Sequence, residues 1–174
     1  TTNNSSDPFK FKINTGTPLN TIITFRILIK DGSYFSNFYF NVTTNVDYIN
    51  VGINDLQTTI TSKSKIGWNQ DGATEGLGFS YLGTQMLYEG GLMIGTSTSA
   101  VSDRVRGSNG TASDQDFTTT ENVFRVVPSV RSEFDIHGVM NDFSASPTQN
   151  LLVSHNAYAW STPGNRKYVI VEYF

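Results

Sequence analysis

The stretch that decides the fold is Ile23–Val42, which reads ITFRILIKDGSYFSNFYFNV. Large hydrophobic residues recur at every second position on both sides of a central Asp-Gly pair, and such alternation is typical of half-buried strands. One face of the first predicted strand is formed by Ile23, Phe25, Ile27 and Ile29. Because Asp31-Gly32 lies between the two runs, where a tight turn is required, the stretch predicts a β-hairpin.

Two further features extend the prediction to the first 46 residues. Tyr34, Phe38, Phe40 and Val42 line one side of the second strand, and Phe9–Ile13, in which Phe and Ile alternate with lysines, predicts a third strand. An immunoglobulin-like sandwich needs about seven strands. We therefore expect residues 1–46 to form a short, incomplete immunoglobulin-like part that ends at a joint near Thr43-Thr44-Asn45.

The remainder of the chain, residues 47–174, consists of short apolar runs separated by glycines and by Asn, Asp and Ser clusters. The runs are Tyr48–Val51, Leu56–Ser62, Leu77–Tyr81, Met86–Ile94, Val123–Val127, Phe134–Met140, Leu151–Tyr158 and Tyr168–Phe174. Many short strands at this spacing predict an all-β fold with a β-sandwich over residues 47–174. Only Ser99–Arg106 suggests a single helical turn.

Composition limits the classes of partner. Charged residues make up 16% of the 174 residues, the net charge of −3 is scattered, and there is no basic stripe of the kind that binds nucleic acid. No apolar run is long enough to span a membrane, so we expect neither nucleic-acid binding nor membrane insertion. The chain has no cysteine, which excludes a disulfide framework and thiolate metal sites.

Candidates for catalysis are few. The histidines are His137 and His155, and Asp135 would share a strand face with His137. Ser97 lies in a Gly-Thr-Ser-Thr-Ser stretch that lacks the second glycine of a hydrolase nucleophile elbow. Because no nucleophile, base and orienting group can be combined from these residues, we predict that the chain is not an enzyme and needs no cofactor.

Metal and sugar binding each have candidate residues. Asp71, Glu75, Asp114 and Asp116 place carboxylates close together in two loops, as a calcium site would require, although Asp is also common in turns for backbone reasons. We predict turn chemistry and no metal, with these four residues as the calcium alternative. Trp68 and Trp160 are the candidates for stacking on a carbohydrate; the alternative is that they fill the core and its rim.

The last strand has apolar residues on both faces. The run is Tyr168, Val169, Ile170, Val171, Glu172, Tyr173 and Phe174. Strands with unpaired edges readily pair with another chain. We therefore predict that this strand is a candidate for assembly with a neighbour.

Several segments resemble a β-rich region of exported proteins from Bacteroidota and related bacteria. They are Asn54–Lys63, Ile66–Asn69, Glu75–Phe79, Leu87–Ser97, Val101–Asp103, Tyr158–Ser161 and Tyr168–Tyr173. In that group the region commonly follows a subtilisin-like serine protease domain and precedes a C-terminal sorting signal. The resemblance implies export and a β-sandwich; it implies no catalysis, because the protease's Asp, His and Ser motifs have no counterpart in this sequence.

The sequence thus favours a non-catalytic structural or accessory module of a secreted or cell-surface bacterial protein. Its expected partners are further copies of itself or other segments of a parent protein, with strand exchange as the means of completing the fold. The alternative is a carbohydrate- or surface-binding module, and a hydrolase is a more distant third.

Overall fold

A computed structural model describes residues 6, 8–14, 16–71, 73–105 and 113–174. The chain is all-β: its described elements are fourteen strands, all in antiparallel pairings, as the sequence predicts. The described residues include no helix long and apolar enough to cross a membrane. The chain falls into two compact units, Thr1–Val46 and Asp47–Phe174.

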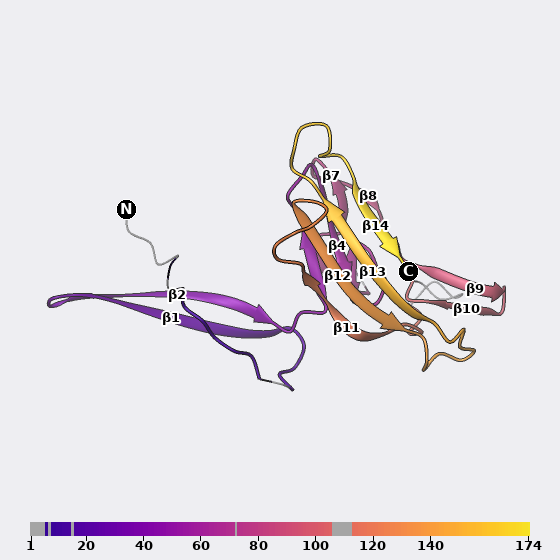
Figure 1. The fold of residues 1–174 in the computed structure, drawn as a ribbon, viewed down its shortest axis with the longest axis horizontal. Helices are drawn as coiled ribbons and strands as arrows, with labels where there is room; N and C mark the ends of the chain where they lie inside the picture. Colours follow the sequence, from indigo (N-terminus) through magenta and orange to yellow (C-terminus); the bar gives the residue numbers. More distant parts are fainter. Residues whose placement is uncertain (1–5, 7, 15, 72, 106–112) are drawn as a thin grey trace. The chain divides into compact units, whose positions relative to one another are not determined.

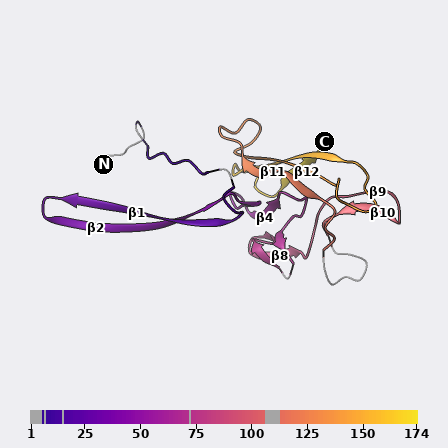
Figure 2. The same cartoon turned by 90° about the horizontal axis from the view of Figure 1, so that it is seen from below.

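The N-terminal unit contains one long hairpin, β1 (Thr21–Asp31) and β2 (Tyr34–Thr44), which run side by side in Figures 1 and 2. The two strands pair along their whole length, from Thr21 opposite Thr44 to Asp31 opposite Tyr34. The two-residue loop between them begins with Gly32, whose φ of 57° suits the first central position of a type II′ turn. The predicted hairpin is confirmed.

The predicted third strand at Phe9–Ile13 is wrong, because residues 8–14 form no strand. The ring of Phe11 instead lies 4.9 Å from the ring of Phe25 in β1. The alternation of aromatic and basic residues in this segment is therefore explained by side-chain contact with the hairpin, with no backbone ladder. The N-terminal unit has two strands in its described part, one fewer than expected.

The larger unit contains two four-stranded antiparallel sheets. The first has the order β3-β4-β7-β8, with bounds Tyr48–Val51, Leu56–Thr61, Phe79–Tyr81 and Thr84–Leu87. The second has the order β11-β12-β13-β14, with bounds Thr118–Arg125, Phe134–Asn141, Leu152–Ala159 and Val169–Tyr173. Two small hairpins accompany them: β5 (Trp68–Gln70) with β6 (Thr74–Gly76), and β9 (Met93–Ser97) with β10 (Ala100–Asp103).

The two sheets pack face to face and form a β-sandwich, with β12 and β13 lying across β4 and β7 in Figure 1. Val51 and Ile60 from the first sheet share one buried cluster with residues of the second sheet, namely Val123, Ile136, Ala157 and Ala159. A second cluster contains Phe117, Met140 and Val153. Alternate residues of β12 and β13 point into this core, which is the period that a two-layer β fold requires.

Two local predictions are corrected. The single helical turn expected at Ser99–Arg106 is wrong in its described part, because Ala100–Asp103 forms β10 and pairs with β9; Arg106 lies outside the described residues. The run Met86–Ile94 is interrupted at Gly90, which bridges to Ile66, so it supplies parts of two strands. In both places backbone pairing with a neighbour decides the conformation, and the local sequence pattern does not report that neighbour.

Candidate functional site

The carboxylate of Asp135 is hydrogen-bonded to the loop that precedes it. Its carboxylate accepts hydrogen bonds from the backbone amides of Val130 at 2.6 Å, Arg131 at 2.7 Å and Ser132 at 2.8 Å. Burial alone would raise the pKa of Asp135, but these amides and the Ser132 hydroxyl outweigh that effect and hold the pKa below its usual value. The carboxylate therefore orders the turn before β12 and is not directed at His137.

His137 and Ser97 likewise have local partners. The Nδ1 atom of His137 lies 2.8 Å from the Oδ1 atom of Asn156 on the neighbouring strand, and Nε2 lies 3.8 Å from a carboxylate oxygen of Glu121. Ser97 is within 3.3 Å of the Ser99 hydroxyl in the turn after β9. Asp135, His137 and Ser97 are thus hydrogen-bonded to other residues, and no hydrogen bond joins them into a hydrolytic triad.

His155 is fully buried, and among the described residues neither of its ring nitrogens has a hydrogen-bond partner. It packs edge-on to the ring of Tyr173, and a Cβ atom at Gly138 would lie only 2.8 Å from its Nε2 atom. Burial, and then the nearby His137, lower the pKa of His155 to about 4. It is a neutral core residue at pH 7.

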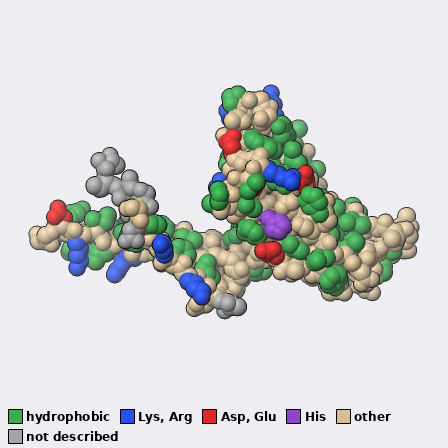
Figure 3. Space-filling view, viewed as in Figure 1, with side chains coloured by type: hydrophobic (Ala, Val, Ile, Leu, Met, Phe, Trp, Pro, Cys, Tyr) green, Lys and Arg blue, Asp and Glu red, His purple; other side chains and the backbone are tan. Residues whose placement is uncertain are grey.

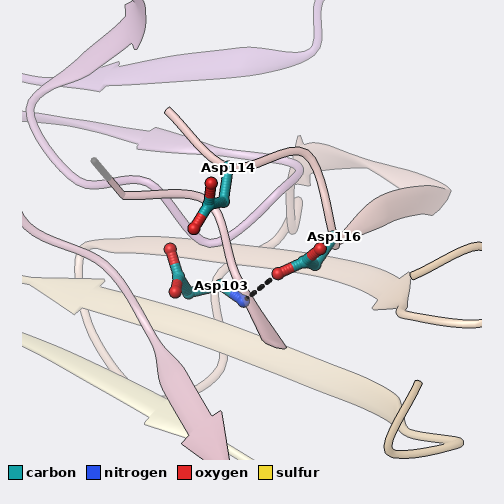
Figure 4. Close-up of side chains that lie close together, drawn as sticks. All are labelled: Asp103, Asp114 and Asp116. Atoms are coloured by element: carbon teal, nitrogen blue, oxygen red, sulfur yellow. Dashed lines mark hydrogen bonds between the residues drawn. The ribbon is translucent and has the colours of Figure 1, made fainter. Parts of the chain in front are cut away.

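The four calcium candidates lie in three different environments. Asp114 and Asp116 meet Asp103, which the sequence analysis missed, and one oxygen from each of the three carboxylates lies within 4.8 Å of the others (Figure 4). Burial first, then Asp114, Asp116 and Glu89, raise the pKa of Asp103. Two oxygens already accept backbone amides: Asp103 from Val105 at 2.8 Å and Asp116 from Asp103 at 3.1 Å.

The Asp103 bond, to an amide two residues on, is local turn chemistry, whereas the Asp116 bond joins two segments distant in the sequence. Calcium takes six to eight oxygen ligands, and the carboxylates of Asp103, Asp114 and Asp116 could supply only part of that set. Asp103 directly follows Val101-Ser102 at the end of a short strand. Asp114 and Asp116 lie more than ten positions further along the chain, and nothing in the sequence pattern indicates that Asp103 would lie next to them.

The other two candidates have cationic or amide partners. Asp71 accepts a hydrogen bond from the buried Lys65 ammonium at 3.1 Å, and Glu75 accepts one from Asn69 at 2.8 Å. Hydrogen bonds from the side chain and backbone of Ser113 are the main cause that lowers the pKa of Asp71 to about 2. Lys65 also lies 3.3 Å from Glu89, so the charge of its buried ammonium is balanced by two carboxylates, of which Asp71 is 45% exposed and Glu89 16%.

The two tryptophans lie in separate places. Trp68 is half-buried against Gly78 and lines a shallow hollow with Tyr88, Gln70, Asp71 and Glu89. The hollow has a volume of about 10 Å³, which is room for about one water molecule. Trp160 is not in this lining; its ring lies 5.6 Å from that of Tyr168.

The candidate assembly strand belongs to the chain's own sandwich. β14 pairs with β13 from His155 opposite Tyr173 to Ala159 opposite Val169. Val169 and Val171 pack against the core, while Ile170 is 41% exposed. Exchange of β14 into another subunit would therefore uncover the core of its own unit. β14 pairs with β13 on one side, and its other edge has no partner strand in the described sheet.

The hairpin presents the most extensive apolar surface. We call the following set the apolar face: Ile23, Phe25, Ile27, Ile29, Tyr34, Phe38, Phe40 and Val42, which lie on one side of the β1-β2 ladder. No apolar side chain described in the N-terminal unit is buried. Figure 3 shows hydrophobic side chains at the surface along this hairpin, with Lys and Arg side chains between them.

No protein-family model matches the chain, and neither a curated protein nor a solved structure matches it. Function must therefore be inferred from the residues and their geometry. In the described part of the N-terminal unit, large apolar side chains of the hairpin are exposed and no apolar side chain is buried.

Acid should destabilise the sandwich through His155. In the unfolded chain the histidine takes up a proton below pH 6.5, whereas in the folded chain it does so only near pH 4, so lowering the pH across this window favours unfolding. The loss is on the order of 3 kcal/mol. Denaturant unfolding of the His155→Leu variant should show a weaker pH dependence than the parent chain between these limits.

The control is His137→Gln, which leaves His155 in place; because burial is the larger cause of the lowered pKa of His155 and His137 the smaller, most of the parental pH dependence should remain. Buried carboxylates such as Asp135 also lose stabilising hydrogen bonds in acid, but they do so in all three proteins. Equal pH slopes for the parent and the His155→Leu variant would contradict the assignment of His155 as a buried neutral group.

Asp103→Asn should stabilise the protein by about 1 kcal/mol at pH 7, because it removes one of three neighbouring negative charges while an amide oxygen still accepts the Val105 amide. Thermal melting in a chelator should match melting in calcium. A bound ion at 100 times its dissociation constant would add about 2.7 kcal/mol, or several degrees. A calcium-dependent rise that disappears in Asp103→Asn would make the cluster a metal site.

Proposed function

We propose that the chain is a non-catalytic structural module of a secreted or cell-surface bacterial protein, and that its hairpin is completed by strands from a neighbouring subunit or from another segment of the parent protein. The observation behind this proposal is the apolar face, which has no buried member within its own unit. Phe38 and Ile29 are more than half exposed, at 57% and 54%.

The energetics favour completion of the hairpin. An isolated two-stranded hairpin is marginally stable in water, whereas three or more strands with a covered apolar face are stable. Covering even 200 Å² of apolar surface contributes roughly 5 kcal/mol, which is comparable to the whole stability of a small domain. The length of β1 and β2, eleven residues each, gives a partner strand many backbone groups to pair with.

The proposed location rests on chemistry that suits the outside of a bacterial cell. The chain has no cysteine, few charges, and a surface rich in Thr, Ser and Asn, and its segments resemble the β-rich region of exported Bacteroidota proteins. A non-catalytic role is supported by the local partners of Asp135, His137 and Ser97.

The hairpin should behave as an uncompleted β-sheet in dilute solution. We expect the chain to enhance the fluorescence of an apolar dye, and the Phe25→Ser and Phe38→Ser double variant to lose most of that enhancement, because both residues lie on the apolar face. The control is Met86→Ser, which removes a single exposed apolar side chain (63%) from the sandwich. A monomer with slowly exchanging hairpin amides and no dye enhancement would refute the proposal.

A carbohydrate-binding module is the second candidate, and the hollow beside Trp68 is the observation that favours it. Sugar sites commonly combine an aromatic platform with carboxylate and amide groups, and here Trp68 and Tyr88 lie beside Gln70, Asp71 and Glu89. Because the hollow is so small, such a site would hold a sugar on its surface and would not enclose it.

Retention on an insoluble polysaccharide tests this second candidate. If it holds, Tyr88→Ala should weaken retention by about tenfold or more, because Tyr88 is 69% exposed and its ring is accessible to a sugar ring from solvent. Leu82→Ala, which changes an equally exposed side chain without an aromatic ring, is the control. Retention that is equal in both variants, or absent in the parent chain, would remove this candidate.

A further inference from the structure

We infer that the outer edge of β2 is a self-pairing edge, at which β2 of a second copy adds antiparallel to form a continuous four-stranded sheet in the order β1-β2-β2-β1. This inference rests on the proposed function, since it names the neighbour that completes the hairpin. Three features of β2 support it: its length, its lack of charged residues, and an outer edge with which no described strand pairs.

β2 lacks every feature with which natural proteins protect an exposed edge. Its sequence, YFSNFYFNVTT, contains no charged residue, no proline and no glycine over eleven residues. Edge strands normally carry lysine, proline or a bulge that prevents pairing with other chains. A long, uncharged edge with five aromatic residues and no bulge in its pairing with β1 therefore favours pairing with another strand.

The opposite edge of the hairpin differs. β1 contains Arg26, Lys30 and Asp31, and the basic segment with Lys10 lies along it: Phe9, Lys10 and Phe11 line a groove with four consecutive residues of β1 and with Phe40 alone from β2. In the described residues no strand pairs with β2 on its outer side. Of the hairpin's two edges, β2 presents the uncharged one.

The other open edges of the described chain do not match this one. β5 and β6 have three residues each, β3, β8 and β10 have four, β9 has five, and β14 has five, including Glu172. β11 has eight residues but contains Glu121 and Arg125. A partner that pairs along all eleven residues without placing a charge at the join is therefore β2 itself, and the partner is a second copy of this chain.

Self-pairing also extends the apolar face. In an antiparallel ladder, residues directly opposite each other point to the same side. Phe38 and Phe40 of one copy would thus lie on the same side as those of the other, next to the ring pairs already formed with β1, such as Phe25 with Phe40 at 5.3 Å. The result is a four-stranded sheet with one continuous apolar face, which an isolated hairpin cannot provide.

Complementary charge variants test the inference. Asn37 and Asn41 are exposed in β2 and lie two residues on either side of Tyr39, the midpoint of the strand. When Tyr39 faces its own copy, Asn37 faces Asn41 of the other copy. Changing both to Asp is nearly isosteric, and Arg26, which is opposite Tyr39, lies diagonal to both positions and tolerates the new charges within the hairpin.

Sedimentation equilibrium of the full chain should show a dimer in the micromolar range. The Asn37→Asp and Asn41→Asp double variant should dimerise at least about tenfold more weakly, because like charges then oppose each other across the join. The Asn37→Lys and Asn41→Lys double variant should also be weakened. An equimolar mixture of the two variants should recover dimerisation, since the opposed charges are then of opposite sign.

A cysteine provides the second readout, since the chain has none of its own. Tyr39→Cys should oxidise to a disulfide-linked dimer, whereas Leu28→Cys, on the same side of the ladder but in β1, should not. Both tryptophans lie in the larger unit, so their fluorescence reports separately that the sandwich remains folded in each variant.

The outcomes separate this inference from the proposed function. A chain that stays monomeric up to about 100 µM, or a mixture of charge variants that fails to recover dimerisation, overturns pairing through β2. If that monomer still binds the apolar dye and its hairpin amides exchange quickly, the hairpin is completed by another segment and the proposed function stands. If the monomer binds no dye and its hairpin amides are protected, both fail.

Discussion

Contact between two apolar sheet faces is the interaction on which the larger unit depends, and the described residues of the N-terminal unit make no such contact. Val51 and Ile60 meet Ile136 and its neighbours across the sandwich, and each of these side chains is at most 3% exposed. The hairpin has the same kind of side chains at the same period, but it has only one layer. Its residues therefore stay at the surface in the absence of a second layer or further strands.

Buried carboxylates hold the loops of the sandwich in place through hydrogen bonds. Asp142 is fully buried and accepts hydrogen bonds from the Ser102 hydroxyl at 2.7 Å and from the Leu151 amide at 2.6 Å. Asp135 does the same for the turn before β12. A carboxylate with several amide donors replaces the water that these backbone groups would otherwise require. Asp135 and Asp116, which the sequence suggests for catalysis and metal binding, likewise accept backbone amides and so stabilise the loops around them.

The sequence was most informative where hydrophobic periodicity and turn chemistry agree. The alternation around Asp31-Gly32 predicts the hairpin, whose two-residue loop is Gly32-Ser33 because Asp31 pairs with Tyr34, and the runs at 134–140 and 151–158 coincide closely with β12 and β13. Short strands such as β5, β6 and β10 were missed because three or four residues give too little pattern, and because their pairing partners lie across a turn. Side-chain meetings such as Asp103 with Asp114 depend on the path of those loops, which periodicity does not describe.

β14 and β2 are both candidates for assembly with a neighbour, and they differ in what lies beneath them. Apolar residues on both faces of β14 suggested a strand destined for a neighbour, yet Val169 and Val171 face the core, and Ile170 alternates with them on the other side. A strand may be apolar on both faces simply because its own sheet is packed on one side and half-covered on the other. Whether a strand is suited to pairing with another chain depends on two features together: whether its edge carries charged residues, and whether its apolar side chains are covered by a core. β14 has a core beneath it and a glutamate at its edge, whereas β2 has neither. The edge of β2, with no core beneath it in the described residues and no charge along it, is therefore better suited to assembly than the edge of β14.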